Sequence, residues 1–173
     1  MKTRKTVLKD LNALGGPSSL RNLAWSFFKN PGFRTVFIYR IQQRCFANRQ
    51  FRLSALISSL NHSLNGAEIL SGCEIGERLI IRHPSGIVIG AKVVIGTDCI
   101  IQSGVTIGEK FIDSKSDGGY PVLGDRVSIA SHAVVIGKIS IGDDVTIGAL
   151  TLVNRSCSSN KILVGVPFRE INR

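Results

Sequence analysis

The sequence predicts a mainly β repeat protein, a prism of stacked turns that follows a short helical segment. Between Ile69 and Val153 an aliphatic residue, usually with Gly after it, returns at intervals of six. This period belongs neither to an α-helix nor to a simple strand. One aliphatic side chain per hexad can point inward from each flat face of a prism, and the small residue after it lets the backbone turn the corner. Stacking such turns buries a continuous aliphatic column.

The aliphatic-Gly pairs are spread over half of the chain. They are Ile75-Gly76, Ile89-Gly90, Ile95-Gly96, Ile107-Gly108, Leu123-Gly124, Ile141-Gly142 and Ile147-Gly148. The spacing is strictest late in the chain, at Leu123, Ile129, Val135, Ile141, Ile147 and Val153. Strands of an ordinary sandwich would instead alternate with a period of two.

Residues 1–66 are predicted to form the helical segment. Residues 1 to about 16 are interpreted as a mobile or loosely docked leader. Ser18 or Ser19 can cap a first helix, which stops at Asn30-Pro31-Gly32.

A second helix is predicted after Gly32 and a third from Phe51 to Leu64. The second has an apolar stripe of Val36, Phe37, Tyr39, Ile41 and Cys45, with Arg34, Arg40 and Arg44 on a solvated face. The third carries Leu53, Leu56, Ile57, Leu60 and Leu64 and ends at Asn65-Gly66. We expect these helices to pack on one another and to cover the first turn of the prism, whose open end would otherwise expose strand edges.

Residues 67–173 are predicted to form the prism and its C-terminal tail. The prism is expected from about Ala67 to Asn154, interrupted once by a polar, Gly-rich loop at residues 109–121. A loop of that length inside a compact repeat is usually functional. After Asn154 the chain is expected to leave the prism through residues 155–161 and to return at residues 164–169.

The composition favours one cytoplasmic module. Four cysteines are widely spread without a Cys-x-x-Cys pair, which favours reduced, mostly buried thiols over a disulfide framework or a zinc site. The first 14 residues lack the uninterrupted apolar core of a signal peptide. No stretch approaches the roughly 18 to 20 apolar residues that span a bilayer.

The net charge of +10, from 22 Lys and Arg against 12 Asp and Glu, indicates an anionic partner. Many of the basic residues precede the repeats, without the interleaved aromatic residues that would stack on bases, so nucleic acid is disfavoured. A phosphate-rich cofactor or an anionic membrane face explains the charge equally well. We therefore leave open a peripheral contact with the inner face of the membrane.

Three segments carry a resemblance to a known family. They are Asn30-Pro31-Gly32-Phe33-Arg34 with Tyr39-Arg40, Gly66-Ala67-Glu68-Ile69 with Ile75-Gly76, and Ile81-Arg82-His83-Pro84-Ser85-Gly86-Ile87-Val88-Ile89-Gly90. Together with Gly165-Val166-Pro167, the chain resembles the hexapeptide-repeat acyltransferases, in the branch of the serine O-acetyltransferases and the O-acetyltransferases of surface-polysaccharide biosynthesis. The resemblance implies a left-handed parallel β-helix with three hexads to a coil, acetyl-CoA as acyl donor, no metal, and a homotrimer with active sites between subunits.

The resemblance also implies catalytic residues. His83 matches the general base that accepts the proton of the acceptor hydroxyl, a task that suits an imidazole. Glu68 matches the carboxylate that orients this base, although the family has Asp there. His62 is expected on a helix surface, and His132 at a surface corner or beside the cofactor.

By the same resemblance, small corner residues let the pantetheine arm approach the backbone. The matching cofactor-binding residues are Ala130, Ser131, Ala133, Gly148 and Ala149. Lys161 and Arg169 are candidates for the phosphates of the cofactor, with solvated charges as the alternative.

The sequence differs from the serine enzymes at the residues that bind the acceptor. Their serine-binding aspartate and second histidine are replaced here by Gly16-Pro17 and Tyr120-Pro121. A sugar hydroxyl needs hydrogen bonds and stacking rather than charged partners. Tyr120, Asp113 and Asp117 could provide these, so we expect a sugar hydroxyl of a cell-surface polysaccharide precursor as acceptor.

Three alternatives compete with this interpretation. One is a serine O-acetyltransferase of cysteine biosynthesis, in which other residues replace the missing serine contacts. A second, a zinc hydratase on the same prism, is disfavoured, because it needs three converging histidines whereas His62, His83 and His132 are expected on a helix and two separate coils. The third is a catalytically silent scaffold, because repeats alone do not specify activity.

Overall fold

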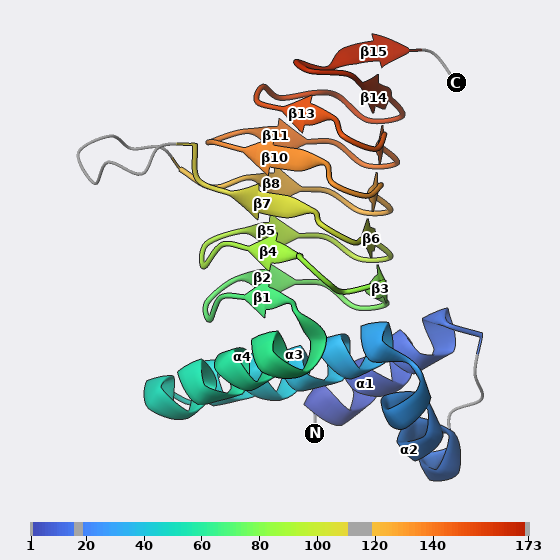
Figure 1. Cartoon of the computed structure of the whole chain (residues 1–173), viewed down its shortest axis with the longest axis vertical. Helices are drawn as coiled ribbons and strands as arrows, with labels where there is room; N and C mark the ends of the chain where they lie inside the picture. The colour runs from blue at the N-terminus through green and yellow to red at the C-terminus, as the bar shows by residue number, and fades with distance from the viewer. Residues whose placement is uncertain (1, 16–18, 111–118, 172–173) are drawn as a thin grey trace.

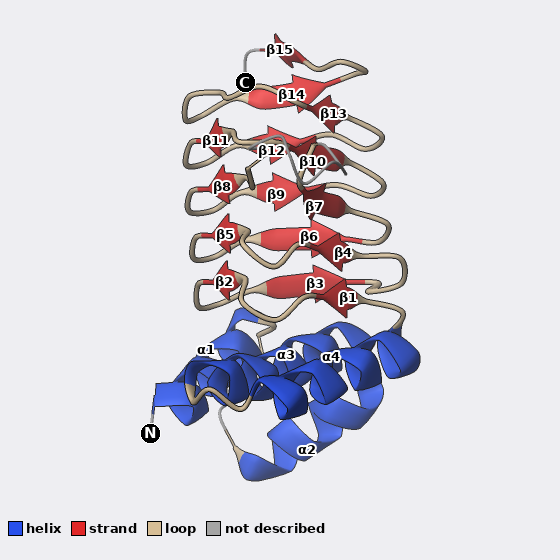
Figure 2. Ribbon diagram, turned by 90° about the vertical axis from the view of Figure 1, so that its left-hand side faces the viewer, coloured by secondary structure: helices blue, strands red, loops and turns tan. Residues whose placement is uncertain are grey.

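The computed structural model shows a prism of parallel strands with helices gathered at its N-terminal end (Figure 1). It describes residues 2–15, 19–110 and 119–171. The predicted fold class, a left-handed parallel β-helix with an N-terminal helical cap, is confirmed. In both views the cap covers the first coil, and the C-terminus lies at the opposite end (Figures 1 and 2).

The prism has three faces, each a sheet of strands from successive coils. Face A holds β1 (Glu68–Ile69), β4 (Val88–Ile89), β7 (Thr106–Gly108), β10 (Val134–Ile136) and β13 (Leu152–Val153). Face B holds β2 (Glu74–Ile75), β5 (Val94–Ile95), β8 (Val122–Leu123) and β11 (Ser140–Ile141). Face C holds β3 (Ile80–Arg82), β6 (Ile100–Gln102), β9 (Ser128–Ile129), β12 (Thr146–Ile147), β14 (Ile162–Val164) and β15 (Arg169–Ile171).

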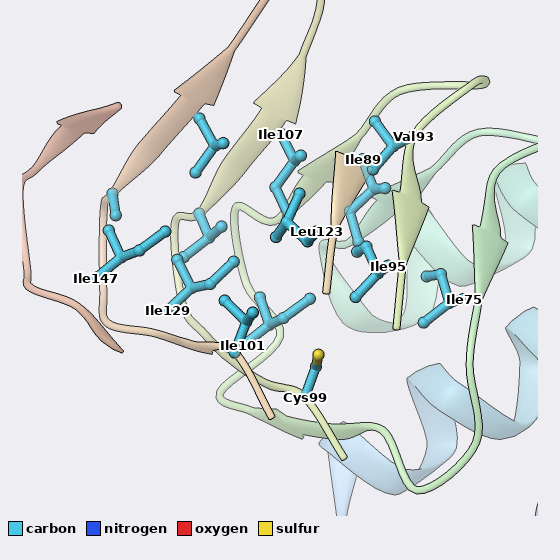
Figure 3. Close-up of a cluster of buried hydrophobic side chains, with 14 of the residues drawn as sticks. Ile75, Ile89, Val93, Ile95, Cys99, Ile101, Ile107, Leu123, Ile129 and Ile147 are labelled. Atoms are coloured by element: carbon cyan, nitrogen blue, oxygen red, sulfur yellow. The ribbon is translucent and has the colours of Figure 1, made fainter. Parts of the chain in front are cut away.

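The register stacks the hexad positions on one another. On face A, Ile69 pairs with Ile89, Ile89 with Ile107, and Val135 with both Ile107 and Val153. These side chains are fully buried, and Figure 3 shows equivalent residues pointing toward one another inside the prism. The predicted inward aliphatic column is therefore confirmed. Burial also raises the pKa of the Cys73 and Cys99 thiols to about 11, so both thiols are neutral core residues.

The cap consists of α1 (Lys2–Ala13), α2 (Leu20–Lys29), α3 (Pro31–Ala47) and α4 (Phe51–Asn65). Ser19 caps α2, its hydroxyl oxygen accepting from the Asn22 N–H at 3.2 Å. The side chain of Asn30 caps α3, which begins at Pro31, one residue before Gly32, because Pro suits a first helical turn. Gly66, in the left-handed conformation, ends α4. None of the described helices is long and apolar enough to cross a membrane.

The prediction of a loosely docked leader is wrong. Residues 2–13 form α1, whose Val7 and Leu11 are buried against Phe33 of α3. The Asp10 carboxylate accepts from the Arg40 guanidinium at 2.9 Å, and both side chains are almost fully buried. Arg40 is therefore not on a solvated face, because this ion pair holds it between α1 and the first coil.

The buried face of the α4 helix is the polar one and not the leucine-rich face that the sequence pattern favours. Leu53, Leu56, Leu60 and Leu64 are 45–68% exposed, whereas Ser54, Ser58, Asn61 and Asn65 are buried. Buried side chains of α4 donate to backbone carbonyls of β1 and α3, the elements that this helix packs against. Ser58 donates to the carbonyl of Ile69 at 2.8 Å, and Asn61 donates to that of Thr35 at 3.1 Å.

The C-terminal segment stays on the prism, so the predicted departure through residues 155–161 is also wrong. Cys157 forms a parallel bridge with Ile141, and β14 pairs in parallel with β12. The antiparallel strand β15 then pairs with β14, and Phe168 is buried in the core. This last coil closes the end of the aliphatic column that faces away from the cap.

Gly32 sets how closely α3 can approach the prism. A Cβ at this position would lie 1.9 Å from the carbonyl oxygen of Ile81. We expect Gly32→Ala to lower the free energy of unfolding by about 1–3 kcal/mol, since the helix must move away from β3. Gly108→Ala is the control in urea denaturation, because a Cβ there meets no atom within 4 Å. Equal stability of the two variants would contradict this close approach.

Candidate functional site

The site residues predicted from the sequence cluster mainly along one edge of the prism. At this edge, which we call the C/A edge, the chain passes from face C to face A at residues 82–86, 102–104, 130–132 and 148–150. The corners stack through backbone hydrogen bonds of 2.9–3.1 Å, in which Gly104, His132 and Leu150 donate to the residues below. Gly86, Gly104, His132 and Leu150 all have positive φ angles, so they occupy equivalent corner positions.

His83 lies in a corner that is two residues longer than the corners above it. Buried residues flank this corner at Ile81 and Ile87, whereas Ile101 and Val105 flank the next one. His83 itself has a φ of 55°, an uncommon conformation for a residue other than glycine, and its side chain is exposed. The next residue, Pro84, is buried and anchors the corner. The two extra residues therefore place an exposed imidazole at a corner position that the shorter corners do not have.

A cleft of about 670 Å³ opens beside His83, where the first coil meets α1, α2 and the start of α3. Among the described residues that line it, Lys29 and Arg82 are the cations, and none is a carboxylate. The Lys29 ammonium lies 5.5 Å from the centre of the Trp25 ring, which also lines the cleft. The cleft thus combines an accessible imidazole with positive charge, which suits an anionic or carboxylate-bearing molecule.

Glu68 lies on face A, two residues after Gly66, which accepts a 2.8 Å hydrogen bond from the Gly86 N–H at the C/A edge. Its exposed carboxylate borders a different hollow, of about 500 Å³, together with His62 of α4. Among the described residues, the structure shows no hydrogen bond or ion pair between Glu68 and His83. The orienting role of Glu68 stays a prediction.

Most of the predicted cofactor residues lie on the C/A edge above His83. Ala130 and Ser131 belong to the third coil, and Gly148 and Ala149 to the fourth. With about 4.8 Å between neighbouring strands, they lie about 10–15 Å along the edge from the His83 coil. The Ser131 hydroxyl donates to the Gln102 side chain at 3.1 Å. These small side chains leave the backbone of the edge open to a long, thin ligand.

The other three candidates for cofactor binding differ from one another. Ala133 is a core residue, because its side chain is fully buried and its N–H and C=O both bond within the prism, so a direct side-chain contact with the cofactor is ruled out. Arg169 is exposed and pairs with Val164, which adjoins Gly148 near the edge. Lys161 lies at the far side of face C, before β14, and forms an ion pair with Glu170 at 3.2 Å.

His132 also belongs to the C/A edge, between the coils of His83 and Ala149. Its imidazole fills the space above Gly104, where a Cβ would lie 2.2 Å from the Nδ1 atom of His132. Sequence reasoning ranked His132 below His83. The hexad count does contain the position of His132, because this residue stands at the same corner position as Gly86 and Gly104.

Tyr120 lies at a different edge, between faces A and B. Its ring packs over Gly90, and its hydroxyl bonds with Glu109. Partial burial and the neighbouring Glu109 carboxylate raise the pKa of Tyr120. One chain therefore does not bring Tyr120 to His83. Asp113 and Asp117, the other predicted acceptor contacts, lie outside the described residues. Within the part of the chain that the structure describes, no group of three His, Cys, Asp or Glu is placed to hold a metal ion.

Comparisons with known proteins identify similar chains. No protein-family model matches. The chain is 35% identical over 143 residues to the serine acetyltransferase of Synechococcus elongatus, covering 83% of this chain but only 58% of that relative. It is 34% identical over 145 residues to the serine acetyltransferase of Helicobacter pylori strain J99, covering 83% of this chain and 82% of that relative.

Solved structures show the same similarity. The serine acetyltransferase of Neisseria gonorrhoeae superposes with a TM-score of 0.89 at 27% identity, covering 99% of this chain and 66% of that one. The structure of that protein in complex with serine superposes with a TM-score of 0.85, covering 98% of this chain and 69% of that one. The similarity therefore extends over both the cap and the prism.

Proposed function

This chain belongs to the serine acetyltransferase family, and from that premise we propose that it transfers the acetyl group of acetyl-CoA to the hydroxyl of serine. The observation that carries the proposal is the match to the Helicobacter pylori enzyme, which extends over most of both chains. The chain spans less than two thirds of the Synechococcus elongatus relative. The accessible His83, beside a basic cleft, supports the assignment from the site.

The expected sugar acceptor, and with it the role in polysaccharide biosynthesis, is contradicted by the comparisons. The matched relatives and solved structures are serine acetyltransferases. The sequence argument rested on two missing serine contacts, at Gly16-Pro17 and Tyr120-Pro121. It did not include Lys29, which only the fold brings to the cleft of His83, or the neighbouring Arg82. In our proposal, Lys29 or Arg82 takes the place of a missing contact by binding the serine carboxylate.

The chemistry assigned to His83 is general base catalysis. Its imidazole accepts the proton of the serine hydroxyl as the oxygen attacks the acetyl carbonyl, so that a carbon–oxygen bond forms and the carbon–sulfur bond breaks. The same imidazolium then returns the proton to the departing thiolate of CoA. The transfer is direct and involves no acetylated residue of the protein.

The position proposed for acetyl-CoA is the C/A edge. A larger side chain at the exposed Ala149 should obstruct this edge without disturbing the core. We expect Ala149→Leu to raise the KM for acetyl-CoA about tenfold while kcat changes little, because a steric conflict costs about 1–3 kcal/mol. Ala47→Leu, at an exposed alanine of α3, is the matched control in steady-state kinetics. An unchanged KM for Ala149→Leu would contradict this route for the cofactor.

A homotrimer would complete the site. His83 and Tyr120 lie at different edges of one prism, so they can meet only across an interface between subunits. The outer surface of face A also presents half-exposed aliphatic residues, Val88, Val134 and Leu152. Sedimentation equilibrium tests this proposal, for which a mass of three chains is expected.

The assay of the proposed function is thiol release from acetyl-CoA in the presence of L-serine, with mass spectrometry to identify O-acetylserine. L-Alanine, which lacks the hydroxyl, is the control acceptor. Thiol release that does not depend on serine would contradict the proposed acceptor. No release with any acceptor, together with no binding of CoA, would leave only the silent scaffold.

A further inference from the structure

The net charge of the chain comes entirely from its helical cap. Residues 1–66 contain 11 Lys and Arg and a single carboxylate, Asp10, whereas residues 67–173 contain 11 residues of each sign. The Asp10 carboxylate is buried and paired with Arg40. The described surface of the cap therefore carries no negative side chain to neutralise its exposed cations.

The α2 helix carries large apolar side chains on the same surface. Trp25 is 64% exposed and Phe28 is 77% exposed. The opposite side of α2 packs on the cap, where the Phe27 ring lies 5.3 Å from that of Phe37. Arg21, Trp25 and Phe28 are spaced by four and three residues, so they share one side of the helix, which we call the outer face of α2. This face combines a cationic side chain with two large apolar side chains that are mostly exposed.

We propose that the outer face of α2 docks the cap onto an anionic lipid bilayer. Cationic side chains bind phosphate headgroups, while Trp and Phe enter the boundary between headgroups and acyl chains. In both overall views α2 lies at the end of the molecule away from the prism, where a flat surface can reach it (Figures 1 and 2). The proposal does not depend on which acceptor the enzyme acetylates.

Charge complementarity favours lipid over the two other occupants. A second cap would bring another net charge of +10 against the first, and the two would repel. Duplex nucleic acid would satisfy the cations but would give Phe28 no apolar environment. An anionic bilayer satisfies both kinds of side chain.

Vesicle flotation of the full chain tests the proposal, with phosphatidylcholine vesicles that contain or lack about one third phosphatidylglycerol. We expect binding only to the anionic vesicles, weakened by high salt. Arg21→Gln with Phe28→Ser should lower the partition coefficient at least about tenfold, because it removes one cation and one inserted ring. The matched control is Lys92→Gln with Val122→Ser, an exposed cation and an exposed aliphatic residue of the prism, which should bind as the wild type does. Circular dichroism confirms that both variants are folded.

Three results would overturn the proposal. Equal partition of the wild type onto neutral and anionic vesicles would remove the role of the cap charge. If the Phe28→Ser variant bound anionic vesicles as tightly as the wild type does, and the wild type bound duplex DNA equally tightly, the outer face would be a general surface for polyanions. If the wild type bound no vesicles but self-associated, and the α2 double variant abolished this self-association, the outer face would be a contact between copies of the chain.

Discussion

Replacing His83 with Asn is expected to lower kcat for serine-dependent thiol release about a thousandfold, within the usual range for loss of a general base. Asn is the suitable substitution because the residue has a φ of 55°, and Asn tolerates this left-handed conformation better than Ala does. The corner should therefore keep its shape while losing its basic group. Because the C/A edge is unchanged, binding of CoA measured by calorimetry should stay close to that of the wild type.

His62→Asn is the control for this experiment. His62 is exposed on α4 and borders the hollow of Glu68 rather than the cleft of His83. Its substitution should leave kcat close to the wild-type value. If His83→Asn retained more than about a tenth of the wild-type kcat, the general base would have to be another residue.

The largest expected change in stability follows from Asp10→Ala. The Asp10 carboxylate accepts from two nitrogen atoms of Arg40, at 2.9 and 3.2 Å, and from the Leu79 N–H at 3.1 Å. Arg40 also donates to the carbonyls of Ile75 and Gly76. Removing the carboxylate leaves a buried cation without its counter-ion, so the free energy of unfolding should fall by about 3–5 kcal/mol.

Urea denaturation followed by circular dichroism measures this loss. The matched control is Arg78→Gln, which breaks the exposed ion pair with Asp98 and should have a much smaller effect. Asp10→Asn should fall between Asp10→Ala and the wild type, since it keeps an oxygen acceptor for Arg40 and Leu79. If Asp10→Ala were as stable as Arg78→Gln, the ion pair would not hold α1 on the prism.

The helical cap shows where sequence patterns are sufficient and where they are not. Ser19, Asn30 and Gly66 mark helix ends correctly because capping is a local interaction between a side chain or φ angle and the adjacent backbone. The buried face of α4 is a different case. Its sequence contains a stripe of leucines and a stripe of Ser and Asn, and periodicity alone favours burial of the leucines. The stripe of Ser and Asn is buried instead, because its side chains donate to the carbonyls of Ile69 in β1 and Thr35 in α3.

For the site, sequence resemblance singled out His83 together with the small residues Ala130, Ser131, Gly148 and Ala149, and the fold places them on one edge. The hexad count explains this success, since residues that occupy the same position of successive coils must stack. The count does not say that Ala133 faces the core. Nor does it place Lys29 beside His83, because these residues come from elements that the repeat does not relate.

By itself, therefore, the sequence determined the β-helix, its aliphatic core and the edge on which His83 lies, because these follow from a period of six and from local backbone geometry. Only the tertiary structure decided how α1 is anchored, which face of α4 is buried and that Lys29 borders the cleft of His83. These features depend on contacts between segments far apart in the chain. There, the need to pair buried charges and backbone carbonyls outweighs the hydrophobic pattern of any one segment.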